Sequence, residues 1–210
     1  MFKIRNAEIK DLDEIVKLEN QIWPEGTRAN KEKFESRLKI FPQGFFLALK
    51  NGKLIGTSTS EIIFYNPKNP PTSWENITNN GYIKNHNPNG NALYVVSIVA
   101  VSRSGGGSAL INAQKNLTQK LNLEYLVLGA RIPGYNKYCK ENGEISIKNY
   151  IKLKRSDGEL LDPELRFYTR NELNLVKINP NNMKNDKESR NYGAIMVWKN
   201  KKWKRKIERR

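Results

Sequence analysis

One stretch of the chain, residues 93–111, restricts the possible folds more than any other. It begins with Leu93-Tyr94-Val95-Val96-Ser97-Ile98-Val99-Ala100-Val101, an apolar run rich in β-branched residues that predicts a buried strand. Ser102-Arg103-Ser104-Gly105-Gly106-Gly107 follows at once, and glycine leaves the backbone N–H groups of a turn unshielded. From Ser108 onwards the apolar spacing is helical. A strand, a glycine turn and a helix N-terminus together favour a phosphate-like anion, because amides and the helix dipole point at one place.

The spacing of these glycines excludes two common nucleotide-binding motifs. No lysine follows them, as a nucleotide-hydrolase loop requires. Three consecutive glycines also lack the Gly-x-Gly-x-x-Gly spacing of a dinucleotide-binding fold. Two interpretations remain from the residues alone. The turn either holds a phosphate or pyrophosphate, with Arg103 adding a full positive charge, or it is a tight connection without a ligand.

The scarcity of cysteine and histidine limits the chemistry. The 210 residues contain one cysteine, Cys139, and one histidine, His86, which excludes an internal disulfide and the usual zinc sites. Cys–His and Ser–His–Asp mechanisms are therefore not expected, and proton transfer must use carboxylates, tyrosine, lysine or water. We expect His86, which lies between asparagines, to be solvated. No apolar run reaches membrane-spanning length, and the first residues resemble a strand rather than a signal peptide. A reducing, cytoplasmic location is predicted.

Positive charge is concentrated near the end of the chain. The formal net charge is +16, and residues 199–210 hold eight lysines and arginines against one glutamate, a net +7, which leaves +9 for residues 1–198. This basic tail either contacts a polyanion such as nucleic acid or is a solvated terminus that aids solubility. We favour the second interpretation. Trp203 and Ile207 are the only apolar residues inside the tail.

Strand and helix patterns alternate along residues 1–198, and no linker divides them into two domains. Apolar runs predict strands at residues 2–6, 45–50, 53–65, 93–101, 124–130, 173–178 and 192–198. Helical spacing and capping residues predict helices that start at Asp11, Lys31, Ser108 and Asp162-Pro163. Asn51-Gly52 predicts a hairpin turn. Residues 66–91 form a long loop rich in proline, asparagine and glycine, and residues 131–162 are predicted to be irregular or weakly helical.

This order of elements resembles the GNAT superfamily of N-acetyltransferases up to about Lys199. Ile98 to Leu110 is similar to the family's acetyl-CoA strand and pyrophosphate loop, and Asp162-Pro163-Glu164-Leu165-Arg166-Phe167-Tyr168 is similar to its later helix. Gly129-Ala130-Arg131-Ile132-Pro133-Gly134-Tyr135 resembles a subgroup whose members are sometimes fused to carbon–nitrogen hydrolase domains. No such hydrolase segment is expected within these 210 residues. The resemblance implies a mixed α/β (α+β) fold with a mostly antiparallel central sheet flanked by helices.

The resemblance also implies a cosubstrate, acetyl-CoA, and the residues that would hold it. The backbone of Ile98, Val99, Ala100 and Val101 would pair with the pantetheine arm. The turn would hold the pyrophosphate through Arg103, Ser104, Gly105, Gly106, Gly107 and Ser108. Two features depart from the family pattern. Only Ser102 and Arg103 separate Val101 from the Ser104-Gly105-Gly106-Gly107 segment, so the loop is short, and the Gly-Phe that usually follows the later helix is missing.

Direct acetyl transfer to an amine needs a base and a proton for the departing thiolate. Tyr168 falls where many GNAT enzymes place the tyrosine that protonates this thiolate. Because histidine is almost absent, Glu61 and Glu25 are the candidate bases. Arg131, Tyr135, Trp74 and Tyr82 are further residues that could line the acceptor pocket or only anchor loops. No metal is expected.

Three functions remain compatible with the sequence. The first is an N-acetyltransferase with an unidentified amine acceptor. The second is a basic, nucleic-acid-associated protein that uses the fold as a platform. The third is an acyl-CoA sensor without catalysis. The resemblance also makes a homodimer possible, since closing strands in this fold often pair between subunits.

Overall fold

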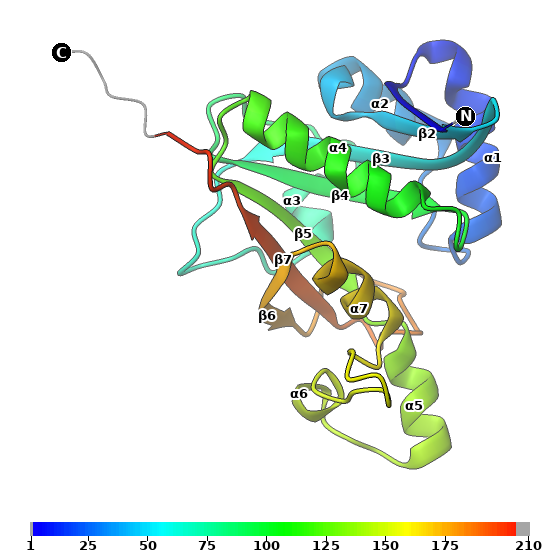
Figure 1. Ribbon diagram of the computed structural model, residues 1–210, viewed down its shortest axis with the longest axis vertical. Coiled ribbons are helices and arrows are strands. Elements are labelled where there is room, and N and C mark those ends of the chain that lie inside the picture. Colours follow the sequence, from blue (N-terminus) through cyan, green and yellow to red (C-terminus); the bar gives the residue numbers. More distant parts are fainter. Residues whose placement is uncertain (1, 205–210) are drawn as a thin grey trace.

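A seven-stranded sheet forms the centre of the protein in the computed structural model, which describes residues 2–204 (Figure 1). The strands occur in the order β1-β2-β3-β4-β5-β7-β6. Only the β4–β5 pair is parallel, so the predicted mostly antiparallel sheet is confirmed. The strands are β1 (Phe2–Asn6), β2 (Phe46–Lys50), β3 (Lys53–Ile63), β4 (Ala92–Ala100), β5 (Tyr125–Arg131), β6 (Asn174–Asn179) and β7 (Gly193–Lys199).

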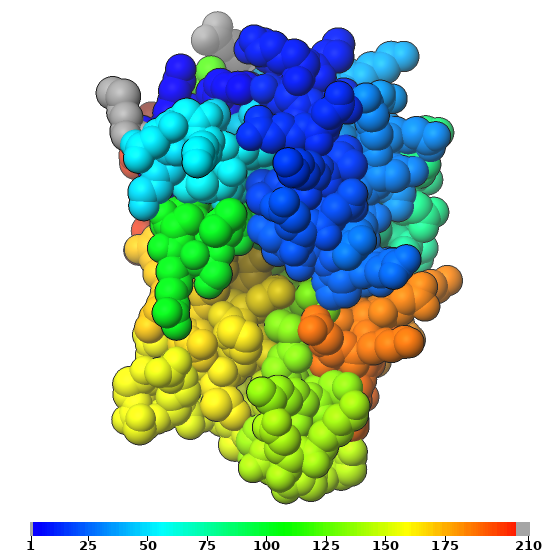
Figure 2. Space-filling model, turned by 90° about the vertical axis from the view of Figure 1, so that its right-hand side faces the viewer, coloured from blue at the N-terminus to red at the C-terminus, as the bar shows by residue number. Residues whose placement is uncertain are grey.

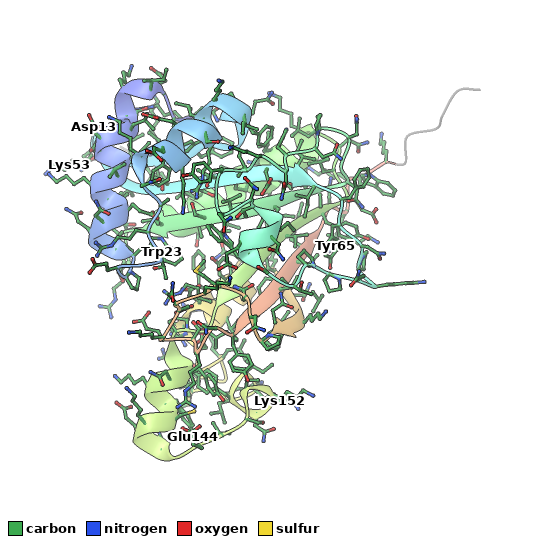
Figure 3. All side chains as sticks on the ribbon, turned by 180° about the vertical axis from the view of Figure 1, so that it is seen from behind. Asp13, Trp23, Lys53, Tyr65, Glu144 and Lys152 are labelled. Atoms are coloured by element: carbon green, nitrogen blue, oxygen red, sulfur yellow. The ribbon has the colours of Figure 1, made fainter. Side chains whose placement is uncertain are left out.

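Helices cover both faces of the sheet. On one face lie α4 (Gly106–Lys120) and α7 (Pro163–Arg170), and on the other lie α1 (Leu12–Ile22), α2 (Lys31–Ile40) and α3 (Trp74–Ile77) (Figures 1 and 3). Two short 3₁₀ turns, η1 (Ile9–Asp11) and η2 (Pro42–Gly44), flank α1 and α2. The helices α5 (Gly134–Asn142) and α6 (Ile147–Tyr150) form a lobe beyond α7, away from the sheet (Figure 1).

Local signals in the sequence explain several of these boundaries. The Asp162 side chain accepts hydrogen bonds from the backbone N–H groups of Glu164 and Leu165, at 3.0 and 3.1 Å, with Pro163 in the first turn of α7. Asn51 and Gly52 both have positive φ, +51° and +79°, as the predicted hairpin turn requires. The buried side chains of β4, β5 and β7 pack against α4 and α7 in one core.

Two local predictions are wrong. Asp11 does not cap α1 with its side chain, because its carboxylate accepts two hydrogen bonds from the Arg5 guanidinium, at 2.6 and 2.7 Å. His86 is not simply solvated. Its ring packs on Phe41 with centroids 4.5 Å apart, and its Nδ1 accepts a hydrogen bond from the Ile62 N–H. Residues 131–162, predicted to be irregular or weakly helical, contain the two short helices α5 and α6.

The first part of the basic tail is attached to the connection between α4 and β5. Asn200 donates from its side chain to the Leu123 carbonyl, and the Asn122 side chain bonds to both the N–H and the C=O of Lys204. The predicted tail beyond Lys204, residues 205–210, lies outside the described residues. Within residues 2–204, no helix combines the length and the apolar character needed to cross a membrane.

Candidate functional site

The sheet opens where β4 and β5 separate. Four residues of β4, Ala92 to Val95, pair with β5, and β5 then continues against β7 alone. The second half of β4 pairs with β3 on one side only. Its other edge is free to pair with an extended ligand, as another strand would.

A β-bulge decides which backbone groups occupy this free edge. Thr59 opposes Ser97 while Ser60 opposes Val95, so Val96 is the one extra residue of β4. Beyond the bulge, the Val101 N–H donates to the Ile55 carbonyl at 2.8 Å. Because antiparallel pairs alternate, Val99 and Val101 direct their backbone groups at β3, whereas Ile98 and Ala100 direct theirs at the gap.

The predicted strand–glycine–helix arrangement is present at the end of β4. Gly105 has φ +83° and precedes α4, and Arg103 also adopts positive φ, +57°. The Gly106 N–H bonds to the Ser104 side chain, and the first N–H that bonds along the helix is that of Ala109. The N–H groups of Gly107 and Ser108 are therefore available to an anion. Although the loop is short, it connects the end of β4 directly to the start of α4.

A cavity of about 600 Å³ lies between the separated strands and reaches the start of α4. In Figure 2 the surface is hollowed where the green segment at the start of α4 faces α7. A Cβ on Gly107 would lie 3.0 Å from the Phe167 ring, so α7 closes directly on the first turn of α4. Residues of α1 and its C-terminal cap, of α3, of β5 and of the β6–β7 connection complete the wall: Ile22, Trp23, Trp74, Leu128, Gly129, Arg131 and Met183. Figure 3 shows Trp23 at the end of α1.

Two cavity residues on α7 carry suitable acid–base chemistry. Glu164 and Tyr168 are four residues apart, one helical turn, and both line the cavity. Burial, with the nearby charges of Asp162 and Asp186, raises the pKa of Glu164 to about 7, although the Arg131 charge opposes the rise. Burial also raises the pKa of Tyr168 well above 10, so its phenol stays protonated at neutral pH. The site thus holds a carboxyl that ionises near neutrality beside a permanent O–H donor.

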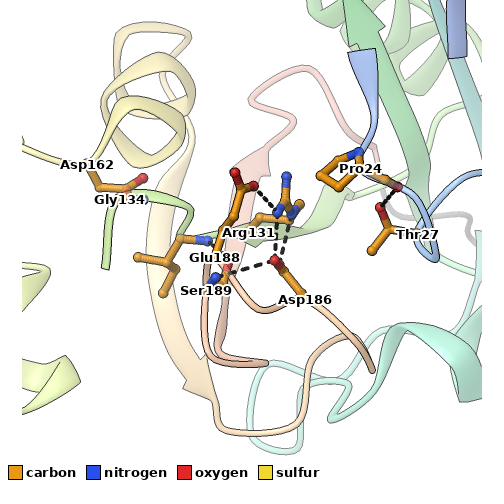
Figure 4. A network of polar contacts seen from close by, with 9 residues as sticks. Pro24, Thr27, Arg131, Gly134, Asp162, Asp186, Glu188 and Ser189 are labelled. Carbon is orange, nitrogen blue, oxygen red and sulfur yellow. Dashed lines mark hydrogen bonds and ion pairs between the residues drawn. The ribbon is translucent and has the colours of Figure 1, made fainter. Parts of the chain in front are cut away.

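Arg131 is held in a polar network at the end of β5 (Figure 4). Its guanidinium donates to both carboxylate oxygens of Asp186, at 2.8 and 2.6 Å, and to Glu188 at 2.6 Å. The same guanidinium stacks over the Trp23 ring at 5.1 Å. Two carboxylates therefore outweigh the one positive charge, and Arg131 is committed to the β6–β7 connection rather than free in the cavity.

The other sequence candidates divide between the cavity and its surroundings. Trp74 lines the cavity, whereas Tyr82 lies against Lys33 and Lys84. Tyr135 is buried in α5 with its hydroxyl donating to the Ile145 carbonyl. Ser102, Arg103, Gly105, Gly107 and Ser108 all line the cavity.

Neither predicted base lies in the cavity wall. Glu25 is exposed in the turn after α1. Glu61 is fully buried in β3, at 0% exposure, and burial raises its pKa to about 8, with the Arg37 charge opposing that rise. Sequence reasoning missed Glu164, although its position one turn before Tyr168 on a capped helix was available as a signal.

The comparisons with known proteins agree with the geometry of the site. No family model matches the chain. The uncharacterized N-acetyltransferase YkwB of Bacillus subtilis is 38% identical over 205 residues, which cover 94% of this chain and 88% of that protein. The probable hydrolase YhcX of the same organism is 34% identical over 200 residues, 94% of this chain. The chain spans only 38% of the length of YhcX.

Two solved structures share the fold. The loading GNATL domain of CurA from Lyngbya majuscula superposes with a TM-score of 0.79 at 20% identity, covering 95% of this chain and 98% of that one. The GphF GNAT-like decarboxylase, in complex with isobutyryl-CoA, gives a TM-score of 0.76 at 20% identity, with 94% and 98% covered. The identity to YkwB over nearly the whole chain, with this fold, shows that the chain belongs to the GNAT-type N-acetyltransferase family.

Proposed function

We propose that the protein is an acyl-CoA-dependent N-acyltransferase that moves an acyl group, acetyl in the simplest case, directly from the CoA thioester to an amine. One observation carries this proposal. The unpaired edge of β4 leads directly to the free N–H groups at the start of α4. The Glu164 carboxyl, which ionises near neutral pH, and the Tyr168 phenol line the same cavity.

The donor would be held by backbone groups. Ile98 and Ala100 offer both N–H and C=O to the amide groups of pantetheine, while Val99 and Val101 bond to β3. The N–H groups of Gly107 and Ser108, the α4 dipole and Arg103 would hold the pyrophosphate. The bound isobutyryl-CoA of the GphF structure supports testing a branched donor beside acetyl-CoA.

Glu164 would act as the base and Tyr168 as the donor to the leaving group. Glu164 takes one proton from the acceptor ammonium, which frees the nitrogen lone pair to attack the thioester carbonyl carbon. The carbon–nitrogen bond forms and the carbon–sulfur bond breaks. The Tyr168 phenol gives its proton to the departing sulfur and regains one from the attacking nitrogen, which loses its second proton, so the products are amide, CoA thiol and the proton held by Glu164. We assign the base to Glu164 because Glu61 is sealed from the cavity and is mostly protonated at pH 7.

Calorimetric titration with acetyl-CoA, isobutyryl-CoA and CoA tests the donor, and thiol release with a panel of amines tests transfer. We expect micromolar binding and amine-dependent thiol release. Thiol release that needs no amine would point to hydrolysis. Loss of CO₂ from malonyl-CoA would point to decarboxylation, which the paired state of Arg131 disfavours because Asp186 and Glu188 already occupy the guanidinium that could hold the donor carboxylate. Absence of CoA binding would contradict the proposal.

A further inference from the structure

Arg37 is the largest fully buried side chain among residues 2–204, and it lies outside the cavity. Its Nε donates to the Gly81 carbonyl at 2.8 Å. Its Nη1 donates to the Thr59 and Ser97 hydroxyls at 3.2 and 3.1 Å, and these two oxygens lie 3.0 Å apart. One guanidinium on α2 thereby joins β3, β4 and the 66–91 loop.

Trp74 holds the neighbouring residue of β4. Its indole Nε1 donates to the Val96 carbonyl at 2.8 Å, and Val96 is the extra residue of the bulge. Gly81 joins the two holding groups, since a Cβ there would lie 2.8 Å from both Arg37 Nη2 and the Trp74 ring. Arg37 and Trp74 therefore fix the two consecutive residues, Val96 and Ser97, at which the register of β4 changes.

The register matters because β4 has period two. The backbone groups of Ile55 and Thr57 face β4 whatever its register, since the Val101 N–H bonds to Ile55. Without the extra residue, Ile98 and Ala100 would move opposite Thr57 and Ile55 and would bond to them. Ser97, Val99 and Val101 would then present their backbone groups to the cavity. A slip of one residue thus removes the two groups that are placed to pair with pantetheine.

We infer that Arg37 and Trp74 are positioning residues that hold the β4 bulge, and through it the backbone edge that binds the acyl-CoA arm. This inference rests on the proposed function for the identity of the ligand. The register of β4 is a property of the protein without ligand and does not depend on the proposed function. We call Arg37 and Trp74 together the clamp. The proposed pyrophosphate site does not depend on the clamp, because its N–H groups belong to the first turn of α4, after Gly105, and not to β4.

The test compares two ligands in clamp variants. Trp74→Phe removes the N–H and keeps a ring, and Arg37→Lys keeps the charge but cannot reach all three acceptors. Trp198→Phe, at an indole outside the cavity lining, is the matched control. We expect each clamp variant to bind CoA about five-fold or more weakly, the effect of one neutral hydrogen bond. Binding of adenosine 3′,5′-bisphosphate, which lacks pantetheine, should stay unchanged.

A ligand-free measurement separates this inference from the proposed function. In wild type, NMR hydrogen exchange should find the Val99 and Val101 amides protected and those of Ile98 and Ala100 fast, with the pattern weakened at least ten-fold in the clamp variants. The clamp would be refuted if its variants lost affinity for CoA and for adenosine 3′,5′-bisphosphate equally. It would also be refuted if their CoA affinity and their hydrogen exchange were the same as in wild type. A wild type with the expected exchange pattern but no CoA affinity would refute the proposed function alone.

Discussion

Replacing Glu164 with glutamine should make the enzyme slower and the protein more stable at the same time. The structure gives the magnitude of the second effect. Burial and the nearby carboxyls of Asp162 and Asp186 outweigh Arg131 and raise the pKa of Glu164 from 4.5 to about 7. One pKa unit corresponds to about 1.36 kcal/mol, so the ionised side chain opposes folding by roughly 3 kcal/mol.

The sign depends on pH. Below pH 4.5 the carboxyl is protonated in both the folded and the unfolded chain, and Glu164 has no effect on the pH dependence of stability. Between pH 4.5 and about 7 the unfolded chain loses its proton first, so stability falls as pH rises. Above pH 7 the whole difference is present. Glu164→Gln is neutral throughout, so it should unfold at a temperature roughly 6–12 °C higher than wild type at pH 8 and nearly the same at pH 4.

Activity should change in the opposite direction. As a general base, Glu164 should give wild type a rate that rises with pH and is half-maximal near pH 7, and the variant should lose about 10²- to 10⁴-fold at pH 8. Thermal unfolding and kcat/KM from pH 5 to 9 measure both effects. Glu25→Gln, at an exposed carboxylate outside the cavity, is the control and should change neither. Full activity in Glu164→Gln would refute the assignment, and loss of the pH dependence in Glu61→Gln instead would transfer the role to Glu61.

Two other changes test the site and the fold. Tyr168→Phe should lower kcat by about 10²-fold while the KM for acyl-CoA stays unchanged, because the phenol acts on the leaving sulfur; an unaltered kcat in steady-state kinetics would exclude that role. Burial lowers the pKa of His86, whose neutral Nδ1 accepts from Ile62, so its contribution is present above about pH 6.5 and is lost as pH falls. His86→Gln keeps an acceptor that does not titrate, so wild type should lose stability relative to it in urea titrations at pH 5; a pH-independent difference would contradict this origin.

The sequence predicted best what is determined locally. The apolar run, the three glycines and the Asp162-Pro163 cap each act through neighbouring residues, and β4, α4 and α7 begin and end within a few residues of the predicted positions. The position of Tyr168 in the cavity could also be expected, because a family resemblance covered the whole of its helix.

Contacts between distant segments could not be predicted in the same way. The bulge at Val96 depends on the pairing of β3 with β4, and nothing within the β4 sequence marks it. The neutralisation of Arg131 depends on Asp186 and Glu188, more than 50 residues later. Glu61 and Glu164 are both glutamates within regular elements, β3 and α7, and only the packing decides that one is sealed in the sheet and the other lines the cavity.

The separation of β4 from β5 also has a mechanical consequence. Four residue pairs, from Ala92 with Tyr125 to Val95 with Leu128, provide the only strand pairing between the β1–β4 half and the β5–β7 half of the sheet in residues 2–204. A molecule lying in the gap would contact both halves and would extend the short line of contacts that joins β4 to β5. A ligand in the cavity would then reduce the motion of the two halves of the sheet relative to each other. The proposed cosubstrate would therefore make the whole molecule more rigid while it is bound.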